Sequence, residues 1–145
     1  PASVAMTGTH DTTTVAGWWT GRDLEWAEKL SRFPADTTLE QQAERRDEDR
    51  ARLWGTLTYN TRPRPKPGDP EPVVDAALRH IGRSASQLAI APLEDLLAER
   101  EQPNLPGTIT EHPNWRRRLD APLADLLDQP DTAARIETLD RARKD

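Results

Sequence analysis

Hydrophobic positions along this chain fall into two short runs and a series of helically spaced stripes. The runs at 4–9 and 88–91 are short, and each predicts a strand. Elsewhere apolar residues recur every three or four positions, as in an amphipathic helix. The helices expected from this spacing are a short one before Gly21, then 22–31, 39–54, 73–81, 93–97, 121–128 and 131–144. The predicted fold class is therefore mostly α with one or two short strands.

Local signals mark the ends of several of these helices. The threonines 12–14 can cap the first helix, and Gly21 is expected to separate it from the second. Thr38-Leu-Glu-Gln41 has the form of a capping box, in which the first and fourth residues satisfy each other's backbone N–H groups. Pro72 suits the first position of the helix 73–81.

The apolar residues of two expected helices predict which face of each turns inward. The helix 39–54 is densely charged and is interpreted as a solvated surface helix with ion pairs four residues apart. Its apolar residues are Leu39, Ala43, Ala51 and Trp54. For the helix 131–144, the expected inner face is Ala134, Ile136, Leu139 and Ala142.

Composition adds that the core is small for the length. Of 145 residues, 34% are hydrophobic and 31% charged, and the mean hydropathy is −0.85. We treat 1–145 as a single segment, with a proline-rich loop at 60–72 and C-terminal helices at 120–145. The five tryptophans, against one Phe and one Tyr, fit either buried anchors or platforms on which sugars stack.

Charge and residue types exclude several function classes. The net charge of −5 argues against a nucleic-acid surface. Without cysteine there is neither a disulfide framework nor a thiolate metal site, and three scattered histidines make a metal centre an unfavoured prediction. No run approaches the ~20 apolar residues that span a bilayer, and no signal segment is evident. The expectation is a cytoplasmic protein, and the start at Pro1, without Met, suggests a piece of a longer one.

The stretch Thr7-Gly-Thr-His-Asp11 carries the first candidate chemistry. A strand ending in His10-Asp11 would place both side chains at the mouth of its sheet, where catalytic groups of parallel barrels collect. The alternative is a polar loop in which Asp11 or Thr12 caps the next helix.

Further motifs favour the first interpretation. Three further segments follow in order along the chain: Leu88-Ala-Ile-Ala-Pro-Leu-Glu-Asp-Leu-Leu97, Asn104-Leu-Pro-Gly-Thr108 and His112-Pro-Asn-Trp-Arg-Arg-Arg-Leu119. With Thr-His-Asp and Gly17-Trp-Trp19, they resemble the C-terminal part of the bacterial 4-α-glucanotransferases (amylomaltases, or disproportionating enzymes). The likeness covers about 3–119, and 33–72 matches only in general character. It implies the last two strands of a (β/α)₈ TIM barrel with their helices.

The resemblance also implies a reaction and roles for three residues. The parent enzyme would transfer α-1,4-glucan segments from a maltodextrin donor to a sugar acceptor with retention and without a cofactor. Asp11 would be the transition-state-stabilising carboxylate, His10 its substrate-binding neighbour, and Asn104 a sugar contact at the rim. The family often has Asn or Leu where Thr12 follows, so contacts from that position stay open. The nucleophile and acid/base would lie on earlier strands, in the remainder of the barrel, so the segment alone is predicted to be inactive.

Other polar and aromatic residues receive structural expectations. Neighbours on a helix point about 100° apart, so Glu94 and Asp95 cannot form a catalytic pair, and Asp95 is assigned a capping or supporting role. One of the adjacent Trp18 and Trp19 is expected to be buried and the other half-buried. A set of loop and core residues is expected to be structural: Trp26, Trp54, His80, Asn114, Trp115 and Leu119.

Two rival functions remain from the sequence. One is a non-enzymatic helical interaction module, and the other is a related α-glucan hydrolase or branching enzyme. Analysis of the products separates the hydrolase from a transferase, because water is its acceptor. The oligomeric state stays open.

Overall fold

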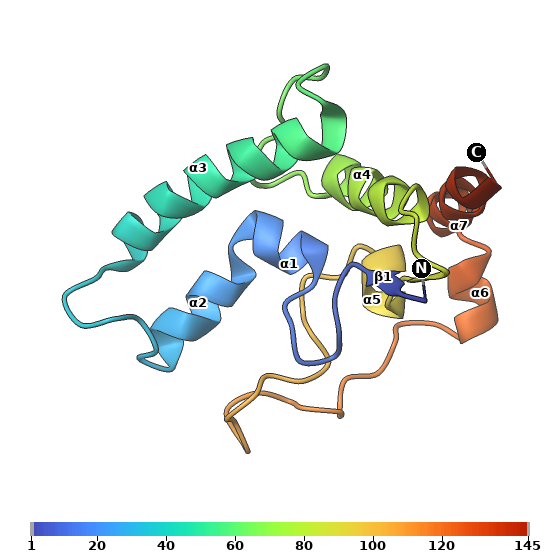
Figure 1. Ribbon diagram of the computed structural model, residues 1–145. Helices are drawn as coiled ribbons and strands as arrows, with labels where there is room; N and C mark the ends of the chain where they lie inside the picture. Colours follow the sequence, from blue (N-terminus) through green and yellow to red (C-terminus); the bar gives the residue numbers. More distant parts are fainter. Residues whose placement is uncertain (1, 145) are drawn as a thin grey trace.

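Helices make up most of the regular secondary structure of the protein, seen in a computed structural model that describes residues 2–144 (Figure 1). In chain order the elements are β1 (Val4–Met6), α1 (Val15–Thr20), α2 (Arg22–Lys29), α3 (Leu39–Thr58), α4 (Glu71–Gly82), β2 (Leu88–Ile90), α5 (Leu93–Leu96), α6 (Leu123–Leu127) and α7 (Pro130–Lys144). The predicted class, mostly α with short strands, is confirmed. Among residues 2–144, no helix combines the length and apolarity needed to cross a bilayer.

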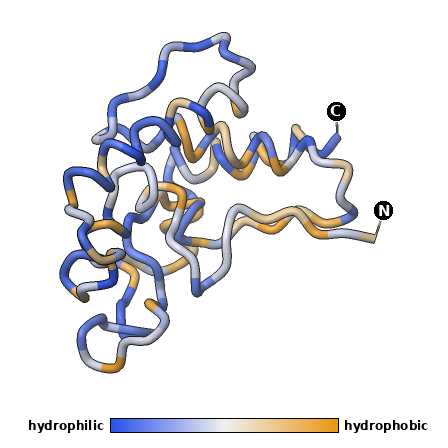
Figure 2. Tube along the Cα trace, turned by 60° about the vertical axis from the view of Figure 1, so that its left-hand side comes forward, coloured by the Kyte–Doolittle hydropathy of each residue, from blue (hydrophilic) through white to orange (hydrophobic). Residues whose placement is uncertain are grey.

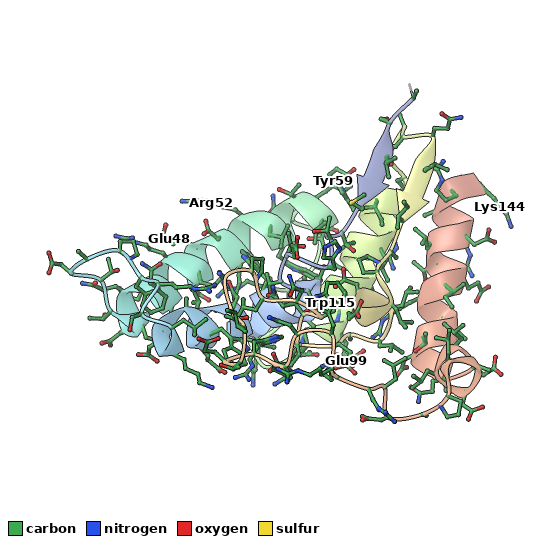
Figure 3. All side chains as sticks on the ribbon, turned by 90° about the horizontal axis from the view of Figure 1, so that it is seen from below. Glu48, Arg52, Tyr59, Glu99, Trp115 and Lys144 are labelled. Atoms are coloured by element: carbon green, nitrogen blue, oxygen red, sulfur yellow. The ribbon has the colours of Figure 1, made fainter. Side chains whose placement is uncertain are left out.

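The two strands pair in parallel, with Val4 opposite Leu88 and Met6 opposite Ile90. They form an apolar two-stranded ribbon (Figures 2 and 3). Val4, Met6, Leu88 and Ile90 are 42–56% exposed, whereas Ala5 packs against the helical core. The first strand is shorter than the predicted 4–9, because the chain leaves the ladder after Met6 and turns at Thr9.

The core surrounds α4, whose apolar stripe faces helices on both sides. On one side Val73 and Ala76 pack with Trp19 and Trp54, from α1 and α3. Elsewhere Leu78 and Ile81 pack with Ala16 of α1, and half-buried Leu139 of α7 lies against them. A helix with buried residues around most of its circumference is expected at the centre of a small helical domain.

Gly21 separates α1 from α2, as predicted. Its φ of +88° lies in the left-handed region that glycine adopts without steric penalty. The N-cap of α1 is Thr14, whose hydroxyl accepts a hydrogen bond from Gly17 N at 2.9 Å. The alternative in which Asp11 or Thr12 caps this helix is therefore wrong.

The interpretation of α3 as a solvated surface helix with a thin apolar face needs correction on that face, although the ion pair between Arg52 and Glu48, four residues apart, is present. The capping box of Thr38 and Gln41 is present, but the buried face consists of Arg46, Arg50, Trp54 and Thr58. The expected inner residues Ala43 and Ala51 are exposed. Long arginine side chains span a gap that alanine would leave empty, and their stems add apolar contact.

Specific partners explain why the two arginines face inward. Arg46 donates to both carboxylate oxygens of Asp23 at 2.8 and 2.7 Å, and its guanidinium lies 4.5 Å from the centroid of the Trp18 ring. Arg50 Nε donates to Trp19 O at 2.7 Å, while burial lowers the pKa of this guanidinium. Paired in this way, the buried charges tie α3 to α1 and α2.

A similar correction applies to α7. Ala134 and Ile136 are exposed, whereas Thr132, Arg135 and Ala142 are buried. Arg135 Nε donates to Asp75 Oδ1 at 2.9 Å and Nη1 to Leu96 O at 3.0 Å, and Nη2 also pairs with Glu71. Polar partners on α4 therefore decide which face of α7 turns inward.

The segment between α3 and α4 runs without regular structure over the two buried tryptophans. Trp54 Nε1 donates to Arg62 O and Trp19 Nε1 to Lys66 O, both at 3.0 Å. A proline-rich extended segment makes few hydrogen bonds of its own, so its carbonyls are free to accept these.

Candidate active site

A tight turn, rather than the end of the strand itself, presents His10 and Asp11. Thr12 N donates to Thr9 O at 3.1 Å and closes the turn. The Thr12 hydroxyl accepts from Thr9 N at 2.8 Å and donates to Thr9 O at 2.9 Å. Position 12, which the resemblance left open, therefore fixes the turn.

Gly8 is required where the turn folds back. A Cβ on Gly8 would lie 2.8 Å from Thr12 Oγ1, which is too close without movement. The glycine thus lets the Thr12 hydroxyl reach the backbone of Thr9.

The structure brings the three sequence-predicted site residues together. Asn104 Nδ2 donates to Asp11 Oδ1 at 2.6 Å, and His10 Nε2 lies 3.3 Å from Asp11 Oδ2. Asn104 N also donates to His10 O at 3.3 Å. The side chain of Asp11 is 50% exposed, so its oxygens remain accessible to a ligand while the neighbours restrict its orientation.

Side-chain hydrogen bonds to its backbone fix the loop that carries Asn104. Thr14 Oγ1 donates to Glu99 O, and Gln102 Nε2 donates to Asn104 O, both at 2.6 Å. Gln102 is buried. Because a fixed amide orients its acceptor better than a mobile one, this support suits a binding position.

Asn114 fixes the far part of the same loop, as predicted. Its Oδ1 accepts from Leu105 N at 2.8 Å, and its Nδ2 donates to Thr108 O at 3.1 Å. These backbone contacts set the orientation of the amide, so Asn114 Oδ1 must also accept the hydrogen bond from His112 Nδ1, at 2.6 Å.

The sequence analysis gave no role to His112, which is 2% exposed and links the loop to α2. Its ring meets Trp26 edge to face at a centroid distance of 4.9 Å, and its Nε2 lies 3.8 Å from Glu101 Oε2. The sequence signal available was a histidine directly before Pro113 and two residues before Asn114. Such a signal does not distinguish a buried histidine from an exposed one.

Glu101 joins this arrangement by accepting hydrogen bonds from α2. Burial raises the pKa of its carboxyl, but hydrogen bonds from Trp26 Nε1 (3.0 Å) and Arg22, with the charge of Arg22, outweigh this. The net effect is a Glu101 pKa below its ordinary value. The carboxylate therefore stays ionised and anchors the loop.

Asp95 has the supporting role predicted for it. It is 1% exposed, its Oδ1 accepts from Val15 N at 2.8 Å, and its Oδ2 accepts from the Thr7 hydroxyl. Burial raises the pKa of Asp95, and these two hydrogen bonds oppose the rise. Asp95 thus joins α5 to the start of α1 and to the segment that leads to Asp11.

The tryptophans divide between core and surface, with one correction. Trp19, Trp26 and Trp54 are buried and Trp18 is half-buried, as expected. Trp115, predicted to anchor the core, is 65% exposed, and Leu119 is 38% exposed. Trp115 lies instead beside His10, with ring centroids 5.2 Å apart. Over residues 2–144, no His, Asp and Glu side chains gather as a metal site would require.

Comparison with known proteins supplies the family. The profile of the 4-alpha-glucanotransferase family matches residues 1–124. The chain is 32% identical over 140 residues to 4-alpha-glucanotransferases of Mycobacterium bovis and Mycobacterium tuberculosis. It is 33% identical over 133 residues to a 4-alpha-glucanotransferase of Haemophilus influenzae.

The alignments cover most of this chain but little of each relative. They take in 92% of the chain for the mycobacterial proteins and 85% for the Haemophilus protein. The chain spans only 19% and 18% of the length of these relatives. Mostly helical, with a polar Asp-His-Asn site, the chain belongs to the 4-alpha-glucanotransferase family. The resemblance in the sequence is thereby confirmed.

Proposed function

We propose that the full-length protein transfers α-1,4-glucan segments from a donor maltodextrin to a sugar acceptor, and that Asp11 stabilises its transition state. The observation that carries this proposal is the half-exposed Asp11 carboxylate between Asn104 Nδ2 and His10 Nε2. The names of the relatives support the reaction class, since each is a 4-alpha-glucanotransferase.

Chemically, a retaining transfer needs a nucleophile and an acid/base, and its transition state resembles an oxocarbenium ion. Asp11 would accept hydrogen bonds from hydroxyls of the sugar at the cleavage point. These bonds strengthen as the ring gains positive charge, so they stabilise the transition state more than the ground state. Asn104 and His10 would orient the carboxylate and offer further contacts to the sugar. The nucleophile and acid/base would come from outside this chain, and no cofactor takes part.

The proposal includes a barrel completed by other parts of the full-length protein. β1 and β2 are parallel neighbours with exposed apolar side chains, which suits the last strands of a parallel barrel lacking their other neighbours. The Asp11 turn follows β1, on the side where barrel enzymes carry their sites. Cytoplasmic maltodextrins are the proposed substrates.

The test is maltotriose disproportionation by the full-length protein and its Asp11→Asn variant. The wild type should release glucose together with longer oligosaccharides. The variant should fold normally and lose about a hundredfold or more in turnover, the scale seen when one charge-stabilising group is removed. Asp125→Asn, at an exposed position on α6, should keep wild-type rates.

Other outcomes of this test have distinct meanings. Glucose without chain lengthening would make water the acceptor and the protein a hydrolase. No rearrangement of maltodextrin by the wild type would reject the proposed reaction. A near-normal rate in Asp11→Asn would reject only the role of Asp11.

A further inference from the structure

Trp115 is an exposed aromatic side chain beside the candidate active site. Trp115, labelled in Figure 3, is 65% exposed. Its ring centroid lies 5.2 Å from that of His10, at an interplanar angle of 50°. Tryptophan has the largest apolar surface of any side chain and is usually buried to a high degree. The protein thus leaves a wide apolar ring exposed next to His10, the chain neighbour of Asp11.

The backbone under Trp115 is unfavourable for this residue type. Arg116 N donates to Pro113 O at 3.1 Å, which closes a turn with Trp115 at its third position. The φ of Trp115 is +59°, and a turn of this type normally has glycine or asparagine there. A bulky residue in the left-handed region is strained, because its Cβ crowds the backbone. Burial of the ring does not offset this strain, so the conformation points to another role.

Hydrogen bonds hold the turn in a defined place. Trp115 N donates to Pro103 O at 3.0 Å, adjacent to Asn104. Asn114, just before Trp115, is fixed by Leu105 N, Thr108 and His112. The indole is therefore attached to the same supported loop that carries the Asn104 contact to Asp11.

The surroundings of the ring fit a sugar. One face of a glucose unit presents C–H groups, while hydroxyls surround its edge, so a site needs an apolar plate with hydrogen-bonding groups at its rim. Trp115 supplies the flat apolar surface. The hydrogen-bonding groups around the sugar would come from Asp11, Asn104 and His10. An acidic ligand would be repelled by Asp11, which favours a neutral one.

We propose that Trp115 binds substrate by stacking its indole on the glucose unit adjacent to the unit held at Asp11. This inference rests on the proposed function and adds a substrate-binding residue that helps to set affinity for the glucan. The ring touches the sugar outside the bond that is cleaved, so it contributes to binding of ground state and transition state alike.

The experiment compares Trp115→Leu and Trp115→Phe in the full-length protein, with maltotriose as substrate. The Leu variant should raise KM about threefold to tenfold, the size of one aromatic contact, and change kcat less than about twofold. The Phe variant should restore most of the affinity, because it keeps a flat ring. Tyr59→Leu is the matched control, since Tyr59 is also an exposed aromatic (76%) with positive φ (+52°), at the end of α3. It should leave KM unchanged.

Chemical modification gives a second readout that does not need a folded variant. N-bromosuccinimide oxidises exposed indoles, and peptide mass spectrometry measures the rate at Trp115 in the wild type. Maltotriose should slow this oxidation several-fold, whereas an equal concentration of sorbitol, which has no ring, should not.

The results that overturn the inference differ from those that overturn the proposed function. An unchanged KM in Trp115→Leu, or oxidation of Trp115 at the same rate with maltotriose, rejects the stacking role while disproportionation continues. A Phe variant no better than Leu also rejects it. If the wild type rearranges no maltodextrin, the proposed function and the inference that rests on it fall together.

Discussion

A single hydroxyl organises the turn that presents the candidate catalytic group. Thr12 Oγ1 both accepts from Thr9 N and donates to Thr9 O, so the turn is satisfied without using the side chains of His10 and Asp11. Those two side chains remain available, and Asn104 restricts the carboxylate from the other side. At the residue scale, function here depends on which polar groups are already paired by the fold.

Asp95 allows a test of one buried carboxyl by pH. Its pKa is raised, chiefly by burial, so the folded state holds this proton more tightly than the unfolded chain. Its stabilising contribution is therefore fully present below the ordinary pKa of an aspartate and is lost as the pH rises through the folded-state value. Asp95→Asn should remove this dependence, because the amide can still accept from Val15 N and donate to the Thr7 hydroxyl.

The measurement is urea unfolding of wild type and Asp95→Asn at about pH 4 and about pH 7. The stability of the variant relative to wild type should rise between the lower and the higher pH. An equal difference at both values would mean that Asp95 does not titrate in this way. Asp125→Asn, an exposed change, is the control for added amides in general.

At the scale of elements, arginines rather than aliphatic residues join several helices. Arg46 and Arg50 attach α3 to α1 and α2, and Arg135 attaches α7 to α4. Each guanidinium has carboxylate or carbonyl partners, which a buried charge requires. This arrangement suits a chain with many charged residues and a small apolar core.

Replacing Arg46 by Met should loosen α3 locally. The variant leaves the Asp23 carboxylate without its bidentate partner and removes the guanidinium from the Trp18 ring. We expect the opening free energy of α3 to fall by about 1–3 kcal/mol, the cost of leaving a partly buried polar group unpaired. Hydrogen–deuterium exchange of α3 amides measures it. The exposed neighbour change Arg45→Met should have little effect, and equal effects of the two changes would contradict the assigned role of Arg46.

At the scale of the whole molecule, the helices form a packed body and the sheet consists of the two strands β1 and β2. α4 lies between α1 and α3 on one side and α7 on the other (Figure 1). The ribbon of β1 and β2 leaves apolar side chains exposed, and a two-stranded sheet is marginally stable by itself in water. The site geometry is therefore supported mainly by helices and the 98–118 loop.

The isolated 145-residue chain should show no transferase activity on maltotriose. The proposed mechanism takes its nucleophile and acid/base from parts of the protein outside this chain, and Asp11 alone stabilises charge without forming a bond. Chromatography of the products after long incubation is the measurement, with the full-length protein as the positive control. Turnover by the purified segment would show that the chain holds a complete site.

The local sequence was sufficient to predict helix caps and helix breaks, because these depend on residues that are close together in the chain. Gly21 separates α1 from α2 because it adopts a left-handed conformation. Thr38 caps α3 because Gln41, one turn later, completes the capping box. The short strands and most helix positions follow from apolar spacing in the same way. The grouping of His10, Asp11 and Asn104 came from a family likeness in the sequence, since nothing in local spacing requires residues 93 positions apart to meet.

Tertiary structure alone decided which side chains are buried and which stay exposed beside the candidate site. Arg46, Arg135 and His112 are inside because partners from distant segments compensate their polar groups, and such partners are invisible in a helical pattern. Trp115 is outside because its turn is tied to Pro103 and Asn114 rather than to the core. Sequence by itself therefore determined the elements and several of their ends, through short-range sterics and hydrogen bonding, although β1 ends earlier and α3 later than predicted. The buried faces of the helices, the hydrogen bonds that support the loop and the exposed Trp115 ring beside His10 depended on contacts that form only when the chain folds.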